Sequence, residues 1–187
     1  ARIRVGQRLT IPGADAAPSG GGEQLVPSTF LGRAYPGSTV AAANVNKAAL
    51  LAMDLPSRAE TQRTVVQVAR EMGVDPRLAQ AHAFQESGFN PASVSPANAI
   101  GTMQVIPSSG EWASNLVGRE INLLDPYDNI VAGVAIIREL KRQFPGNMDY
   151  AIAAYYQGAG GVRQHGLYSD TRRYVAQVRA HMSTFAG

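Results

Sequence analysis

The sequence contains no cysteine, and this absence excludes several kinds of chemistry. A chain without cysteine cannot form a disulfide scaffold, bind a metal through thiolates or use a cysteine nucleophile. The absence does not assign a compartment, because cysteine-free proteins are compatible with both reducing and oxidising surroundings.

Charged residues and long hydrophobic runs are also scarce. Only 17% of the 187 residues are charged, and the net charge of +3 is too small to indicate nucleic-acid binding, so we expect no nucleic-acid partner. No run approaches the roughly 18 apolar residues that a membrane helix requires, so we expect no membrane span. The chain opens at Ala1 with neither an initiator methionine nor a signal peptide, and we therefore expect a fragment or a processed form.

The apolar residues, 45% of the chain, suffice for one domain with an N-terminal extension. Residues 14–46 are rich in Ala, Gly, Pro and Ser, which is typical of a linker. Before them, apolar and polar residues alternate over residues 1–13, and this pattern is consistent with a short hairpin unrelated to any known repeat. The segment VGQRLTIPG, residues 5–13, also resembles the end of a LysM carbohydrate-binding repeat, and we assign it no binding role.

After residue 46 the apolar residues recur at helical spacing, and signals for helix starts are frequent. Ser57 and Glu60 have the spacing of a capping box. Asp75 and Asp125 each precede a proline, which is typical of an N-cap followed by the first helical position. No convincing strand is predicted over residues 47–187. We therefore expect an all-α fold, a compact bundle of about six helices, preceded by a mostly irregular N-terminal segment.

Glu86 is the first candidate for chemistry, because it falls in the last turn of a predicted helix that ends at Gly88. The negative end of the helix dipole and burial against Phe84 and Phe89 would both raise the pKa of its carboxyl. A carboxylic acid that stays protonated at neutral pH can act as a general acid. The alternative is an ordinary surface glutamate at a helix end. His82 lies one turn earlier, where we favour packing over a charged role.

Five segments, taken together, resemble the motifs of the soluble lytic transglycosylases. In that family the first motif has a Glu-Ser pair, the second a Gly-Leu-Met-Gln run, and the others contain Asp-Pro, Ala-Ala-Tyr and Tyr-Val. Matching segments occur here in the same order between residues 47 and 187, with Thr in place of the Leu of the second motif. They are ESGFNP (86–91), SPANAIGTMQVIP (95–107), LDPYDNIVAG (124–133), AAYYQG (153–158) and DTRRYV (170–175).

This resemblance implies a fold, an activity and a set of site residues. The family has a fold like that of goose-type lysozyme, with a substrate groove, and it cleaves the β-1,4 bond between N-acetylmuramic acid and N-acetylglucosamine in peptidoglycan. Residues 47–187 would then be the catalytic domain. Glu86 matches the catalytic residue, a single glutamate that acts as acid and then as base while a 1,6-anhydro sugar forms. The residues expected to bind the substrate or lie near the carboxyl are Ser95, Met103, Gln104, Tyr155 and Tyr174.

The resemblance also implies an exported protein that acts on glycan strands in the cell wall or periplasm, expected as a monomer without metal or cofactor. Several positions depart from the family pattern. Thr102 replaces a leucine, Asn98 replaces a glycine, and Tyr156 and Gln157 replace an Asn-Ala pair. Asp170 replaces a glutamate, and we expect Asp170 to cap the last helix. Two other functions stay open at this point, a hydrolytic muramidase that uses water and a wall-binding module without catalysis.

Overall fold

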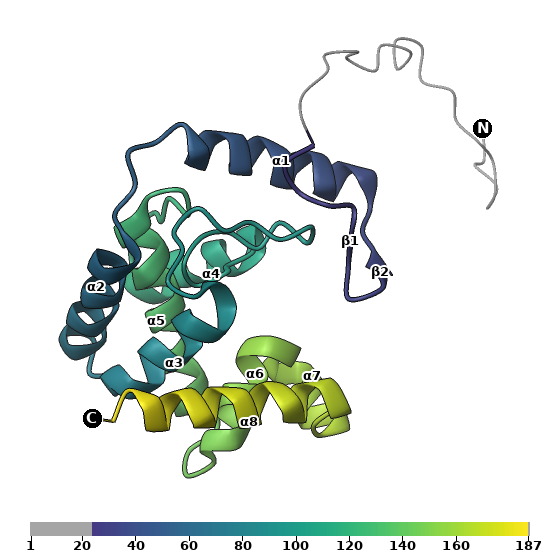
Figure 1. Ribbon diagram of the computed structural model, residues 1–187. Helices are drawn as coiled ribbons and strands as arrows, with labels where there is room; N and C mark the ends of the chain where they lie inside the picture. The colour runs from purple at the N-terminus through teal and green to yellow at the C-terminus, as the bar shows by residue number, and fades with distance from the viewer. Residues whose placement is uncertain (1–23, 187) are drawn as a thin grey trace, which may run out of the picture.

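Eight helices and one short hairpin make up residues 24–186, the part of the chain that the computed structural model describes (Figure 1). The all-α prediction is confirmed, and the number of helices exceeds the expected six. The segment with the LysM resemblance, residues 1–13, lies outside the described residues. The elements are β1 (Thr29–Phe30), β2 (Arg33–Ala34), α1 (Gly37–Leu51), α2 (Arg58–Glu71), α3 (Pro76–Ser87), α4 (Pro107–Val117), α5 (Pro126–Gln143), α6 (Met148–Gln157), α7 (Ala159–His165) and α8 (Ser169–Thr184).

The predicted helix starts are confirmed at three places. The hydroxyl of Ser57 accepts from the backbone N–H of Glu60, whose carboxylate accepts from the N–H of Ser57, and this capping box starts α2. Asp75 and Asp125 cap α3 and α5 with their carboxylates, each followed by proline. These caps satisfy backbone N–H groups that have no partner within a helix.

Part of the expected linker, residues 14–46, is helical. Helix α1 begins at Gly37, inside residues 14–46, and the β1–β2 hairpin precedes it. The helix is held by contacts to the loop that follows α3. The ammonium group of Lys47 donates to the carbonyl of Ala92 over 2.6 Å, and the amide of Asn46 donates to Asn98 over 2.9 Å. Figure 1 shows α1 lying across that loop.

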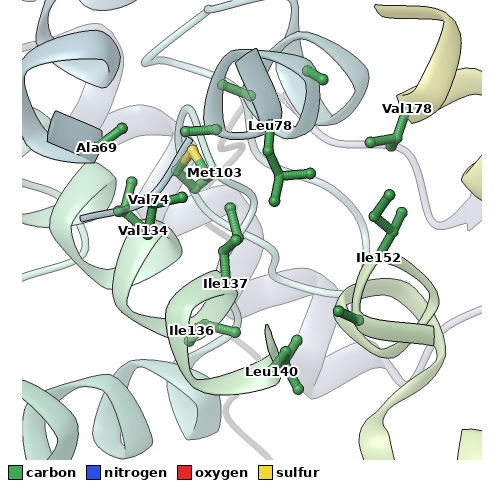
Figure 2. Packing of buried hydrophobic residues seen from close by; sticks show 14 of the residues in the cluster. Ala69, Val74, Leu78, Met103, Val134, Ile136, Ile137, Leu140, Ile152 and Val178 are labelled. Carbon is green, nitrogen blue, oxygen red and sulfur yellow. The ribbon is translucent and has the colours of Figure 1, made fainter. Parts of the chain in front are cut away.

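The hydrophobic core is built around α5, whose middle, residues 129–137, is buried on every face. Helix α5 packs against α2, α4 and α6, while α3 packs against α2 and α8. Figure 2 shows side chains from these helices meeting in one cluster, with Met103 from the loop before α4 among them. Within the described residues, no helix is long and apolar enough to cross a membrane.

Gly133 explains how α5 comes close enough to hold that loop. A Cβ atom at Gly133 would lie 2.5 Å from the Cβ and Cγ atoms of Met103, which is too close for any side chain. The glycine therefore allows the fully buried Met103 to rest directly on the backbone of α5.

Candidate active site

The carboxyl of Glu86 lies at the end of α3, where the chain turns through Gly88 in a left-handed conformation with φ of 61°. Burial raises the pKa of Glu86 from its ordinary 4.5 to about 7, and a hydrogen bond from the hydroxyl of Tyr174 opposes this rise. The raised pKa agrees with the direction predicted from the sequence. The sequence attributed the rise to the helix dipole and to burial against Phe84 and Phe89. In the structure burial causes the rise, and the hydrogen bond to the carboxyl comes from Tyr174 on α8.

Tyr174 connects Glu86 to the buried His82. The hydroxyl of Tyr174 donates to Oε1 of Glu86 over 2.7 Å and lies 2.9 Å from Nδ1 of His82. Burial lowers the pKa of His82 to about 3, so its ring is neutral at working pH and brings no positive charge to Glu86. The packed role favoured from the sequence is the one that the structure shows.

Ser95 and Gln104 hold the shape of the loop between α3 and α4. The hydroxyl of Ser95 accepts from the N–H of Ala99 over 3.2 Å. The side-chain amide of Gln104 donates to the carbonyls of Ser93 and Gly101, at 3.1 and 2.9 Å. Gln104 itself has a φ of 51°, in the left-handed region that residues other than glycine seldom adopt. Both side chains therefore bond to the loop itself.

Met103 belongs to the same loop, and Tyr155 on α6 contacts it. The resemblance places Met103 along the substrate groove, but the structure places its side chain in the core with no exposed surface, so this expectation is corrected. The hydroxyl of Tyr155 donates to the carbonyl of Met103 over 2.7 Å. The ring of Tyr155 lies 4.7 Å from that of His82. The ring of Tyr155 thus packs against α3 one turn before Glu86, while its hydroxyl binds the loop and not the carboxyl of Glu86.

Two other polar residues, which the sequence did not single out, fix this loop to the helices. The buried amide of Asn129 on α5 accepts from the N–H of Met103 and donates to the carbonyls of Ile100 and Leu123, at 2.8 to 3.0 Å. The hydroxyl of Ser87, next to Glu86, donates to the carbonyl of Thr102 over 2.7 Å. Ser87 and Asn129 lie within two of the five motifs, and this was the only indication of their role in the sequence.

Tyr156 and Asp170, two of the departures from the family pattern, interact with each other. The hydroxyl of Tyr156 donates to Asp170 over 2.8 Å, and the ring of Tyr156 stacks on that of Tyr174 at 4.8 Å. This bond contributes to lowering the pKa of the Asp170 carboxyl. Asp170 lies in the first turn of α8, whose N-cap is Tyr168, so the expected capping role of Asp170 is corrected.

Two neighbouring cavities, of about 570 and 490 Å³, lie along α2 and the start of α3. Both are bordered by Gln62, Val66, Arg70 and Gln80, and neither includes Glu86. Across residues 24–186 no cluster of three His, Cys, Asp or Glu side chains is arranged to hold a metal ion.

The family is shown by comparison with known proteins. The model of the transglycosylase SLT domain matches residues 64–177, a range that contains Glu86 and its hydrogen-bond partner Tyr174. The chain therefore belongs to the transglycosylase SLT domain family.

Curated relatives and solved structures agree with this result. The chain is 36% identical to a membrane-bound lytic murein transglycosylase C from Mannheimia succiniciproducens, over 61% of this chain and 35% of the relative. It is 27% identical to the lytic transglycosylase Slt from Pseudomonas aeruginosa, solved as an inactive glutamate-to-glutamine mutant, with a TM-score of 0.61 over 66% of this chain and 23% of that one.

The 70 kDa soluble lytic transglycosylase from Escherichia coli, at 23% identity, shares the fold with a TM-score of 0.57 over 80% of this chain and 33% of that chain. The expected lysozyme-like fold is confirmed by these structures. The chain spans about a third of the length of the curated relatives that it matches.

The raised pKa of Glu86 predicts a dependence of stability on pH. Between its ordinary pKa of 4.5 and about 7, the folded state holds a proton that the unfolded state releases, so folding stability is lost as the pH rises through this window. Glutamine does not ionise, so a Glu86→Gln variant does not lose stability in this way. We expect the free energy of unfolding of Glu86→Gln, relative to the parent protein, to increase by about 3 kcal/mol between about pH 4 and about pH 8.

Urea denaturation of both proteins at the two pH values measures this difference, in which the contributions of all other titrating groups cancel. A difference that stays constant with pH would mean that the carboxyl titrates normally in the folded state.

Proposed function

We propose that this domain is a peptidoglycan lytic transglycosylase, with Glu86 as its catalytic acid and base. The observation that carries the proposal is the partly buried carboxyl of Glu86, which accepts a hydrogen bond from Tyr174 and whose pKa of about 7 leaves it partly protonated at neutral pH and also able to accept a proton. Membership of the SLT family and the names of the relatives support the choice of peptidoglycan as substrate.

In the first step, the proton of Glu86 passes to the oxygen that bridges N-acetylmuramic acid and N-acetylglucosamine. The bond from C1 of the muramic acid to this oxygen breaks, and its electron pair stays with the departing sugar. The acetamido oxygen of the muramic acid stabilises the positive charge at C1. Burial raises the pKa of Glu86 against the hydrogen bond from Tyr174, and no second carboxylate contributes to the shift, which agrees with a mechanism that uses only one.

In the second step, the 6-hydroxyl of the same muramic acid attacks C1, and the Glu86 carboxylate accepts the hydroxyl proton. The product is a 1,6-anhydro sugar, and Glu86 regains the proton that it gave up. The hydrogen bond from Tyr174 stabilises the carboxylate between the two steps. A group that must first lose and then regain a proton works best when its pKa lies near the working pH.

The loop residues take supporting roles in this proposal. Hydrogen bonds of Gln104 and Ser95 within the loop before α4 fix its conformation beside the end of α3. The hydroxyl of Tyr155 on α6 also binds this loop. Met103 anchors the loop in the core and does not contact the glycan. We expect the substrate to bind where the carboxyl of Glu86 faces this loop.

The proposed substrate also bears on the compartment in which the domain acts and on its partners. Peptidoglycan lies outside the cytoplasm, so we place the activity in the cell wall or periplasm, with the domain acting as a monomer on glycan strands. The membrane-bound relative is consistent with action at that site.

Mass spectrometry of a digest of purified peptidoglycan tests the proposal. We expect soluble fragments that end in 1,6-anhydro-muramic acid. Fragments with reducing ends would show that water replaces the 6-hydroxyl and would identify a hydrolytic muramidase. Sedimentation of the protein with the wall, without release of fragments, would identify a binding module that does not catalyse.

A further inference from the structure

A buried histidine lies one turn before Glu86 on α3, and the proposed mechanism does not use it. The side chain of His82 is 1% exposed. Its ring lies between the rings of Tyr155 and Tyr174, at centroid distances of 4.7 and 5.9 Å. Its Nδ1 atom lies 2.9 Å from the hydroxyl oxygen of Tyr174, which is itself bonded to Glu86. A polar ring at this depth calls for a reason beyond packing.

Counting hydrogens along this chain of contacts fixes the state of the histidine. The hydroxyl of Tyr174 has one hydrogen, and an ionised Glu86 can only accept, so that hydrogen points to Oε1 of Glu86. The oxygen of Tyr174 can then only accept from Nδ1 of His82, which must carry a hydrogen. Because burial lowers the pKa of His82 to about 3, the ring is neutral and its Nε2 atom carries none.

We propose that His82 is a positioning residue that acts through Tyr174 to keep the acidic proton of Glu86 on the carboxyl oxygen Oε2. A proton on Oε1 would point at the hydroxyl oxygen of Tyr174. That oxygen already accepts the Nδ1 hydrogen of His82, and the hydrogen of the tyrosine would lose Oε1 as its acceptor. The proton therefore stays on Oε2, which Tyr174 leaves free for the bridging oxygen of the glycan. This inference rests on the proposed function of Glu86.

The pKa values of the other titratable groups around this chain of contacts are shifted away from neutral pH. From α6, Tyr155 and Tyr156 have raised pKa values, and so does Tyr174 from α8. The pKa of Asp170, which binds Tyr156, is lowered, as is that of His181, which binds Gln85. Within the hydrogen-bonded chain of Glu86, Tyr174 and His82, only Glu86 has a pKa near neutral pH.

Nitrogen-15 NMR of the His82 ring in the unmodified protein tests the assignment directly. We expect a neutral ring with the hydrogen on Nδ1 between about pH 5 and about pH 9, the less common tautomer of free histidine. A hydrogen on Nε2 would overturn the proposal, because Nδ1 would then have to accept the only hydrogen of Tyr174.

A double-mutant cycle tests whether His82 acts through Tyr174. The measured quantity is the pKa of the Glu86 carboxyl from carbon-13 NMR. We expect His82→Phe to raise it by about half a pH unit, because the tyrosine hydroxyl loses the donor that polarises it, and His82→Asn, which keeps an N–H donor, to restore it. In a Tyr174→Phe background, His82→Phe should cause no further rise.

A rise that persists without the Tyr174 hydroxyl would mean that His82 affects Glu86 through packing alone, and failure of His82→Asn to restore the pKa would argue the same. Neither spectrum requires turnover. The proposal can therefore fail while the protein still cleaves peptidoglycan, and it can hold if the proposed activity is absent. If His82→Phe does not fold, the spectrum of the unmodified protein and His82→Asn still decide.

Discussion

Replacing Glu86 by glutamine is expected to slow the release of soluble fragments from purified peptidoglycan by about 10²–10⁴-fold. Glutamine keeps the size of the side chain, and its amide oxygen can still accept the hydrogen bond from Tyr174. It has no proton to give to the bridging oxygen and no carboxylate to accept one from the 6-hydroxyl. Chromatography of the released muropeptides over time measures the rate.

Glu120→Gln is the matched control, because Glu120 is an exposed glutamate outside the five motifs. The same chemical change there should leave the rate unchanged. Circular dichroism and thermal unfolding show whether both variants keep the fold. Wall lysis by Glu86→Gln at the parent rate would contradict the role of Glu86 as acid and base.

Replacing Asn129 by alanine is expected to lower the free energy of unfolding by about 3–5 kcal/mol. Three backbone groups lose their partner at once, the N–H of Met103 and the carbonyls of Ile100 and Leu123. Each buried polar group left without a partner costs about 1–3 kcal/mol. The loss is a large part of the 5–15 kcal/mol typical of a domain. Urea denaturation followed by circular dichroism measures the change.

Asn115→Ala is the control for this substitution. Asn115 lies on the exposed side of α4, so the same change there should alter the free energy of unfolding by less than about 0.5 kcal/mol. Equal stability of the two variants would show that the amide of Asn129 does not hold the loop.

The parts of the fold that depend on neighbouring residues could be predicted from the sequence. The helices that start after Ser57, Asp75 and Asp125 were predicted because a cap and the N–H groups that it satisfies lie within one turn. Helix α1 was missed for the opposite reason. Its composition is that of a linker, and its contacts, such as that of Lys47 with Ala92, lie 45 residues away in the chain.

The candidate site divides in the same way. The raised pKa of Glu86 followed from its place at a helix end, but its partner Tyr174 is 88 residues away, and only folding brings the two together. The side chain of Met103 is apolar enough for either a groove or the core, and the nearby Gly133 decides for the core. No local pattern could indicate that the amide of Asn129 reaches back to the loop before α4.

The most direct test of the account is a carbon-13 NMR titration of the Glu86 carboxyl, identified by its loss in Glu86→Gln. The account requires an acid that is still partly protonated at neutral pH, because burial withholds water from the carboxylate. It predicts a pKa of about 7. A pKa near the ordinary value of 4.5 would contradict it, because the group would then have no proton to donate at the pH where the enzyme is proposed to work.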